Sequence, residues 1–309
     1  MERTGRLTPP AVTEVLDLLG AALAADGVRP VSEESELRLQ HGGPAGGSDL
    51  TARTPDGALV GYARLELPEE LAEAEAELVV APDARRQGVG TALLARLEEL
   101  AGERPLRVWA HGELPGSTEL ATARGYRRAR VLLQMRRPLS GVDADPHPSL
   151  PPELSIATFR PGVDEAAWLA VNARAFAHHP EQGRWTPEDL AVREAEPWFD
   201  PAGFFLAWRA EPAGPRLLGF HWTKVHPAGE AGDEPVGEIY VLGVDPDAQG
   251  MRLGRALTDT GLAHLRRAGL TSVLLYVDAD NTAAVALYER SRFTRHAVDV
   301  SWERSPTPR

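Results

Sequence analysis

The sequence predicts an α/β (α+β) protein made of two copies of one domain, each a mixed central sheet flanked by helices. Three observations predict this class. Helical and strand periodicities alternate along the chain. The segments 76–100 and 240–265 resemble each other. Between them, 137–154 carries five prolines and little apolar pattern, which is typical of a linker.

The two halves show the same order of elements. Each begins with a helix, continues through alternating strands into a strand–loop–helix segment, and ends with a strand, a helix and a closing strand. The expected elements are helices at 12–25 and 164–177, strands at 57–67 and 216–225, strand–loop–helix units at 76–100 and 240–265, strands at 106–111 and 272–278, and closing strands at 128–137 and 295–303.

An internal repeat aligns the halves. Pro82 aligns with Pro246, a spacing of 164 residues (246 minus 82), and at this spacing Gly90 meets Gly254. A single repeat of this length indicates two copies of one domain, because solenoid repeats are much shorter. We expect an N-terminal domain at 1–139, a linker at 140–152 and a C-terminal domain at 153–309.

Composition excludes several classes of protein. The chain has 309 residues, a formal net charge of -12 and no cysteine, so disulfides, thiolate metal sites and a cysteine nucleophile are absent. The acidic balance argues against nucleic acid as a partner. No apolar run approaches the roughly 18 residues of a membrane helix, and the N-terminus lacks a signal-peptide core. We expect a cytoplasmic monomer that does not bind membranes.

A glycine-containing loop follows the strand in each strand–loop–helix unit. In RRQGVGTA (85–92) two glycines allow a tight turn, and the helix N-terminus behind it adds partial positive charge, which suits a pyrophosphate. The second loop, in DAQGMRLGRAL (247–257), has Arg252 at the place of Gly88. Arg252 keeps its backbone N–H, and we expect it to have a negative φ, as at a helix start. Its side chain either points at a phosphate or faces solvent.

These segments together resemble the GCN5-related N-acetyltransferase family. The resemblance rests on VDPDAQGMRLGRAL followed by a strand and NTAAVALYERSRF in the second half, and on APDARRQGVGTA in the first. It implies acetyl-CoA as co-substrate, held by loop N–H groups with the pantetheine arm along a splayed strand, and no metal. The implied cofactor contacts are Leu242, Gly243, Val244, Gln249, Gly250, Met251, Arg252, Leu253, Gly254, Arg255, Asn281, Thr282, Ala283, Ala284, Val285 and Ala286, with Leu78, Val79, Val80, Arg86, Gln87, Gly88, Val89, Gly90 and Thr91 in the first half. The histidines 178, 179, 221 and 226 have no usual metal-ligand spacing.

Only the second half carries an acid and a base. GEIYVLGV (237–244) is expected to place Glu238, Tyr240, Leu242 and Val244 on one strand face. At the repeat spacing of 164, Glu238 aligns with an alanine of the first half. An amine must lose a proton to attack a thioester, and Glu238 is the candidate general base.

Tyr288 is the candidate acid that protonates the departing thiolate. It stands seven residues after Asn281, close to two helical turns, so we expect both on one face of one helix. Aligning Tyr126 with Phe293 places Ala121 opposite Tyr288. Since the first half lacks both groups, we expect it to be non-catalytic, although it can hold a second acetyl-CoA.

Several segments resemble, more specifically, the mycothiol synthase family. They include AFAHHPEQGRW (175–185), LGFHWTKVHP (218–227) and DGVRPVSEE (26–34). The resemblance implies acetylation of the cysteinyl amine of a pseudodisaccharide, cysteinyl-glucosaminyl-inositol (desacetylmycothiol), giving mycothiol. It implies substrate contacts at Glu33, Glu181, Lys224, Glu238 and Tyr276. Two alternatives stay open: a tandem acetyltransferase for another amine, such as an aminoglycoside or a peptide N-terminus, and a non-catalytic acetyl-CoA-binding regulator.

Overall fold

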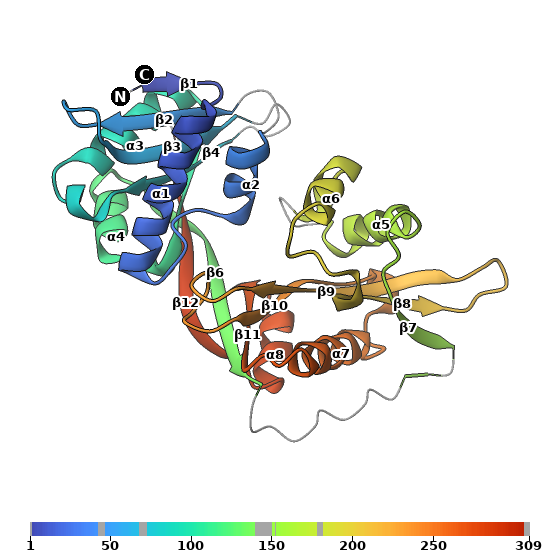
Figure 1. Cartoon of the computed structure of the whole chain (residues 1–309). Helices are drawn as coiled ribbons and strands as arrows, with labels where there is room; N and C mark the ends of the chain where they lie inside the picture. Colours follow the sequence, from blue (N-terminus) through green and yellow to red (C-terminus); the bar gives the residue numbers. More distant parts are fainter. Residues whose placement is uncertain are drawn as a thin grey trace. The chain divides into compact units, whose positions relative to one another are not determined.

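The chain forms two compact units in this computed structural model, which describes residues 2–42, 47–67, 73–139, 150–151, 153–177 and 182–305. Unit 1 comprises Met1–Gln134, Val277–Thr282 and Arg295–Arg309, and unit 2 comprises Met135–Tyr276 and Ala283–Thr294 (Figure 1). Each unit has a mixed sheet with helices packed on it, which confirms the predicted α/β class with two related copies.

Unit 1 is built mainly from the first half of the chain. Its helices are α1 (Pro9–Asp26), α2 (Glu33–His41), α3 (Val89–Ala101) and α4 (Pro115–Ala123), with short 3-10 turns η1 (Pro82–Ala84) and η2 (His111–Glu113). Its strands are β1 (Glu2–Thr4), β2 (Ser48–Arg53), β3 (Leu59–Glu66), β4 (Ala74–Val80), β5 (Leu106–Ala110) and the first part of β6 (Arg127–Pro138).

The last strand of the chain completes the sheet of unit 1. β12 (Thr294–Arg304) lies antiparallel to β5, with Val300 opposite Ala110 and Trp302 opposite Val108. The order β1-β2-β3-β4-β5-β12 is antiparallel except at the parallel β4–β5 pair. Val300 and Trp302 join the core formed by α3 and these strands, so burial of their side chains stabilises this pairing.

Unit 2 repeats the arrangement. Its helices are α5 (Glu165–Ala175), α6 (Pro187–Glu194), α7 (Leu253–Arg267) and α8 (Thr282–Arg290), with 3-10 turns η3 (Gln182–Arg184), η4 (Pro201–Gly203) and η5 (Pro246–Ala248). Its strands are β7 (Leu154–Thr158), β8 (Phe204–Arg209), β9 (Arg216–His226), β10 (Val236–Val244) and most of β11 (Ser272–Asp278). The order β11-β10-β9-β8-β7 is antiparallel except at the parallel β10–β11 pair.

Two apolar layers cover the sheet of unit 2. On one face, α5 contributes Trp168 and α6 contributes Leu190 to a cluster with Phe204 and Trp222 of the sheet. On the other face, α7 packs through Leu253 and Leu257 (Figure 1). Burial of these large side chains fixes the strands that carry the candidate site.

The spatial units do not follow the expected sequence segments. Residues 295–309 are expected in the C-terminal domain by their position in the chain, yet they belong to unit 1 because β12 pairs with β5. Of the expected linker 140–152, only residues 150 and 151 lie among the described residues. The assignment of catalysis to the second copy stays a prediction.

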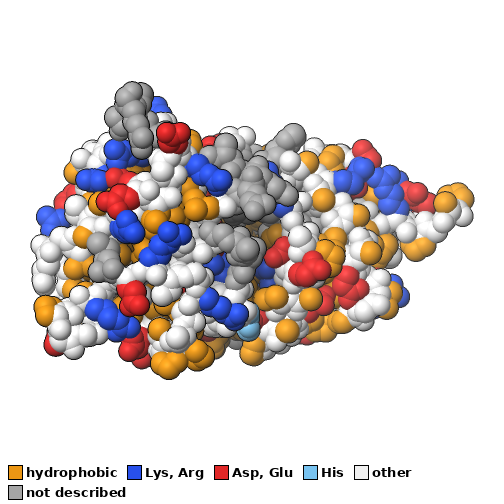
Figure 2. Space-filling model, turned by 90° about the horizontal axis from the view of Figure 1, so that it is seen from above, with side chains coloured by type: hydrophobic (Ala, Val, Ile, Leu, Met, Phe, Trp, Pro, Cys, Tyr) orange, Lys and Arg blue, Asp and Glu red, His pale blue; other side chains and the backbone are white. Residues whose placement is uncertain are grey.

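Two surface properties bear on partners. Acidic and basic side chains are interspersed with hydrophobic ones on the face shown in Figure 2. Within the described ranges, no helix is long and apolar enough to cross a membrane.

Candidate active site

The loop before α7 and the loop before α3 share one backbone path. Each has two left-handed residues, at equivalent positions: Arg86 (φ 61) and Gly88 (φ 86) in unit 1, Gly250 (φ 82) and Arg252 (φ 59) in unit 2. The expected negative φ at Arg252 is therefore wrong. Arg252 is the N-cap of α7, so it lies one residue before the helical conformation begins. Each copy keeps the turn with one glycine and one arginine.

The loop of unit 2 fits a pyrophosphate. Leu253, Gly254 and Arg255 form the first turn of α7, where backbone N–H groups have no acceptor within the helix. The two left-handed residues turn the preceding backbone toward the same helix end, and the Arg252 side chain is exposed. N–H groups and the helix dipole together favour an anion at this position.

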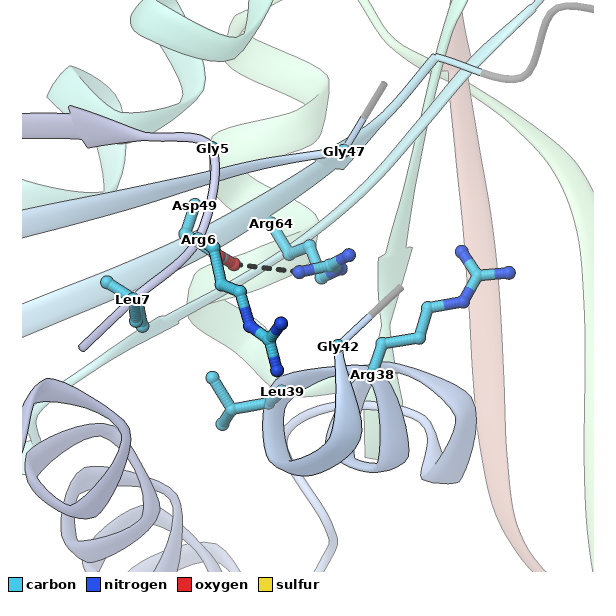
Figure 3. A pocket seen from close by; sticks show the side chains of 9 residues that line it. All are labelled: Gly5, Arg6, Leu7, Arg38, Leu39, Gly42, Gly47, Asp49 and Arg64. Carbon is cyan, nitrogen blue, oxygen red and sulfur yellow. Dashed lines mark hydrogen bonds and ion pairs between the residues drawn. The ribbon is translucent and has the colours of Figure 1, made fainter. Parts of the chain in front are cut away.

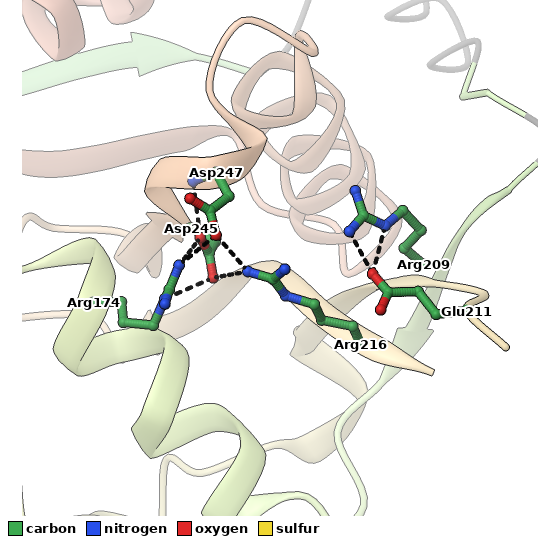
Figure 4. A network of polar contacts seen from close by, with 6 residues as sticks. All are labelled: Arg174, Arg209, Glu211, Arg216, Asp245 and Asp247. Atoms are coloured by element: carbon green, nitrogen blue, oxygen red, sulfur yellow. Dashed lines mark hydrogen bonds and ion pairs between the residues drawn. The ribbon is translucent and has the colours of Figure 1, made fainter. Parts of the chain in front are cut away.

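An ion-pair network ties the start of this loop to the fold. Asp245, 1% exposed, accepts hydrogen bonds from Arg174 of α5 at 2.8 and 3.0 Å (Figure 4). Arg216 of β9 bridges Asp245 at 3.4 Å and Asp247 at 2.7 Å. Burial opposes ionisation of Asp245, but the hydrogen bonds from Arg174 and the Asp247 N–H outweigh it and lower its pKa. The loop is therefore anchored by charged bonds on two sides before its first glycine.

Replacing Arg252 with Gly is expected to preserve turnover. The change removes left-handed strain of about 1–2 kcal/mol and adds about 0.5–1 kcal/mol of unfolded-chain entropy. Thermal unfolding of the variant should therefore occur at or slightly above the wild-type temperature. The matched control is Gly88→Arg, whose left-handed position has open space around it, and which should unfold earlier. A collapse of acetyl-CoA binding in Arg252→Gly would instead identify the guanidinium as a phosphate ligand.

Strands β10 and β11 separate beside the loop. They pair only from Gly237 to Ile239, although β10 continues to Val244. The β9–β10 register shifts between Ile239 and Val241, so Tyr240 is an extra residue in a β-bulge. Pairing between β3 and β4 in unit 1 has no such shift.

Because of the bulge, the expectation that four residues of β10 share one face is wrong. Tyr240 and Val241 both pack on the aromatic cluster, whereas Leu242 and Val244 pack on the α7 side. Glu238, Tyr240, Leu242 and Val244 therefore do not share one face, because the extra residue reverses the alternation. A bulge also leaves backbone groups outside the ladder, where they are available to a ligand.

Glu238 is a buried carboxylate at the point where the strands separate. It is 7% exposed and lies directly opposite Lys224 of β9, which is 4% exposed. One carboxylate oxygen, Oε2, is 2.6 Å from Nε2 of His226. The structure thus brings together two of the predicted residues, Glu238 and Lys224, and adds a histidine that the sequence did not single out for catalysis.

Aromatic rings surround the charges on this face. The Lys224 ammonium lies 4.3 Å from the ring centre of Trp198 and 5.5 Å from that of Tyr240. Arg193 of α6 donates from Nε to the Tyr240 hydroxyl at 2.9 Å and lies 3.9 Å from the centre of Trp185. Cation–π attraction helps to hold such charges in a largely buried site. The clustering of aromatic residues in 185–199 was the sequence signal that could have indicated these rings around the charged side chains.

Tyr288 is carried by α8. It is 7% exposed, and its ring packs edge-on against Phe293 at 5.7 Å. Burial raises its pKa, so the phenol keeps its proton at neutral pH. Asn281 lies just before the first residue of α8 and is exposed, so it does not share a helical face with Tyr288 as expected. The helix begins one residue later than that expectation requires.

Unit 1 has no acid or base at the equivalent positions. Ala74 and Ala121 are buried there. Instead, a charged cluster joins its strands: His111 contacts Glu77 through Nε2 at 2.9 Å and Asp299 through Nδ1 at 3.2 Å. Glu77 also accepts hydrogen bonds from the backbone N–H and the hydroxyl of Ser32, the N-cap of α2. Since Glu33 is the first residue of α2, this cluster fixes the start of the helix that carries it.

The remaining predicted residues lie on several elements of each unit. Leu242, Gly243 and Val244 end β10, Gln249, Gly250 and Met251 form the loop, Thr282, Ala283, Ala284, Val285 and Ala286 begin α8, and Tyr276 lies on β11 with 39% exposure. In unit 1, Leu78, Val79 and Val80 end β4, Arg86 and Gln87 form the loop, and Val89, Gly90 and Thr91 begin α3. Glu181 lies outside the described residues.

A separate hollow in unit 1 holds none of these residues. Arg6, Arg38 and Arg64 line it (Figure 3). Arg64 is paired with Asp49 at 2.9 Å and Glu66 at 2.6 Å, so its charge is already balanced. Among the described residues, no group of three or more histidine or acidic side chains is arranged to hold a metal ion.

Comparison with known proteins decides the family. Residues 22–126 and 170–293 match the acetyltransferase (GNAT) family. The chain belongs to the GNAT acetyltransferase family. This GNAT acetyltransferase is 72% identical over 300 residues to the mycothiol acetyltransferase of Geodermatophilus obscurus, an alignment that covers 97% of this chain and 96% of that protein. It is 54% identical to the mycothiol acetyltransferase of Salinispora arenicola, and that alignment covers 98% of this chain and 96% of the relative.

Solved structures support the tandem fold of this GNAT acetyltransferase. A tandem GNAT protein from the clavulanic acid biosynthesis pathway superposes with a TM-score of 0.75 at 22% identity, covering 99% of this chain and 98% of that one. A GCN5-related N-acetyltransferase from Sphaerobacter thermophilus superposes with a TM-score of 0.69 at 25% identity, covering 99% of this chain and 96% of that one. The family resemblance seen in the sequence is confirmed. The chain is an N-acetyltransferase that uses acetyl-CoA.

Proposed function

We propose that this enzyme transfers acetyl from acetyl-CoA to the cysteinyl amine of cysteinyl-glucosaminyl-inositol, forming mycothiol. Three relatives that are 54% to 72% identical to this chain are named mycothiol acetyltransferase, which supports this substrate. The observation that carries the proposed chemistry is Glu238, a buried carboxylate beside the separating ends of β10 and β11. A carboxylate at that position suits a cationic amine and can take its proton.

Glu238 acts as the general base in this proposal. The substrate arrives as an ammonium ion, and Glu238 accepts one proton so that the nitrogen lone pair can attack the thioester carbonyl. Acetyl-CoA supplies the acetyl group as that thioester. Backbone N–H groups in the Leu242 to Val244 region, where β10 no longer pairs with β11, polarise the carbonyl oxygen. The attack is direct, and no acyl-enzyme forms.

Tyr288 completes the reaction as general acid. Its buried phenol stays protonated at neutral pH and donates to the sulfur as the C–S bond breaks. The nitrogen, now bonded to the acetyl carbon, releases its second proton, which replaces the one given up by Tyr288. The first turn of α7 with the preceding loop, Gln249 to Arg255, holds the pyrophosphate, and the start of α8 lies along the cofactor. In unit 1 the equivalent residues Arg86 to Thr91 hold a second acetyl-CoA that is not turned over.

The substrate contacts extend the same proposal. Lys224 and Tyr276 join Glu238 in unit 2, and Glu33 and Glu181 contribute further polar groups. Hydrogen-bonding side chains of this kind suit a pseudodisaccharide rich in hydroxyls. We further propose that the enzyme works as a cytoplasmic monomer on small molecules, without nucleic acid or membrane partners.

Replacing Tyr288 with Phe tests the acid. We expect kcat to fall by about tenfold to a hundredfold, at the low end for acid catalysis, because a thiolate with a pKa near 8.5 leaves readily. Acetyl-CoA binding, measured by calorimetry, should change little, because Phe fills the same buried space beside Phe293. If binding is lost instead, Tyr288 has only a structural role.

A further inference from the structure

Both ring nitrogens of His226 face carboxylates. His226, the last residue of β9, is 5% exposed. Its Nε2 lies 2.6 Å from Glu238 Oε2, and its Nδ1 lies 3.3 Å from Glu230 Oε2. Glu230 stands in the turn between β9 and β10, and its side chain is 39% exposed. His226 is neither the proposed base, Glu238, nor the proposed acid, Tyr288.

The geometry determines the charge of this ring. A neutral imidazole has one N–H, so its other nitrogen would turn a lone pair toward a carboxylate oxygen. An imidazolium donates from both nitrogens and satisfies both carboxylates. Burial opposes this charge, but the hydrogen bonds to Glu230 and Glu238 outweigh it and raise the pKa of His226.

Other charges approach the same site from neighbouring elements. Lys224, two residues earlier on β9, lies opposite Glu238 and disfavours the imidazolium. Arg136 of β6 donates to the carbonyl of Ala231, in the turn that carries Glu230. The Glu238 carboxylate thus has a hydrogen-bonded cation in His226 and a second cation directly across the strand pair.

We propose that His226 is a positioning residue for the base: as an imidazolium it donates a charge-assisted hydrogen bond to one oxygen of Glu238 and holds the carboxylate in place. This inference rests on the proposed role of Glu238. A buried carboxylate tends to take up a proton, and a cation in contact with it opposes that tendency. The bond at Oε2 also orients the other oxygen toward the amine.

His226→Gln tests the proposal. Glutamine keeps an N–H donor near the position of Nε2 but carries no charge. The acid limb of the pH profile of kcat/KM should move upward by about one to three pH units, because the base loses its cation. Activity near the pH optimum should fall much less than in Glu238→Gln, and acetyl-CoA binding should not change.

The matched control is Glu230→Gln. It removes the outer carboxylate but leaves the bond between His226 and Glu238, so the acid limb should stay at its wild-type position. A His226→Gln profile that coincides with the wild type would overturn the inference. If Glu238→Gln retains full activity, Glu238 is not the base, whereas the proposed function fails only if the wild-type enzyme releases no CoA on the cysteinyl pseudodisaccharide.

Nuclear magnetic resonance of the imidazole nitrogens covers the case in which His226→Gln does not fold. Wild type and Glu238→Gln are compared, because Gln is close to the shape of Glu. One histidine should titrate at least about one pH unit lower in the variant, since it loses its carboxylate partner. If no histidine titration moves between the two proteins, the charged pair does not exist and the inference is wrong.

Discussion

Glu238→Gln is expected to lower kcat/KM by about 10²–10⁴-fold, the usual contribution of a general base. Glutamine has nearly the shape of glutamate but cannot accept the ammonium proton. The loss should be greatest at low pH, where a larger fraction of the amine is protonated. Steady-state release of CoA, measured from about pH 6 to pH 9, checks both the size of the loss and its pH trend.

A nearby carboxylate provides the control for this variant. Glu234, in the turn before β10, is exposed and accepts a hydrogen bond from Thr271 at 3.0 Å. Glu234→Gln removes the same charge a few residues away and should leave turnover unchanged. Full activity of Glu238→Gln at low pH would remove Glu238 from the mechanism and leave Tyr288 as the sole candidate for proton transfer.

The largest expected effect on stability is at His111 of unit 1. Its ring joins the buried carboxylates of Glu77 and Asp299. His111→Gln leaves those charges without a cation, and the loss of one partner from such a cluster costs about 3–5 kcal/mol. Hydrogen exchange of the β4 and β5 amides measures the stability of this unit by itself. His296→Gln, at an exposed position, should change it by no more than about 0.5 kcal/mol.

This contribution should depend on pH with a defined sign. Burial opposes the charge of His111, but hydrogen bonds to Asp299 and Glu77 and their negative charges raise its pKa from 6.5 to about 10. A raised pKa means that folding favours the protonated form. The stabilisation is therefore complete below about pH 6.5 and declines as the pH rises toward 10. A wild-type advantage over His111→Gln that instead increased across this range would contradict the charge state assigned to His111.

The repeated architecture could be predicted because its signals are local. Periodicity indicated the helices and strands, and the alignment of Pro82 with Pro246 indicated two copies. The partner of the last strand could not be predicted. The sequence of β12 has a strand pattern that does not depend on which strand it pairs with. Its pairing with β5 depends on contacts between residues nearly 200 positions apart in the sequence, such as Arg107 with Glu303.

The sequence predicted several residues of the site but not the backbone geometry that positions them. Glu238 and Lys224 were expected among the substrate contacts, and the register of β9 and β10 places them face to face. The bulge at Tyr240 could not be foreseen, because a register shift depends on the pairing strand. Left-handed backbone at Arg252, and at Arg292 (φ 66), is imposed by the turn against residue preference. The role of Glu238 and Tyr288 in catalysis stays a prediction.

Release of CoA with purified enzyme, acetyl-CoA and cysteinyl-glucosaminyl-inositol tests the central claim most directly. We predict one CoA and one amide formed per turnover, with kcat/KM at least about a hundredfold above that for an aminoglycoside or a peptide N-terminus. Equal or faster turnover of those amines would assign the enzyme another substrate. Binding of acetyl-CoA without release of CoA on the cysteinyl pseudodisaccharide would contradict the proposed function.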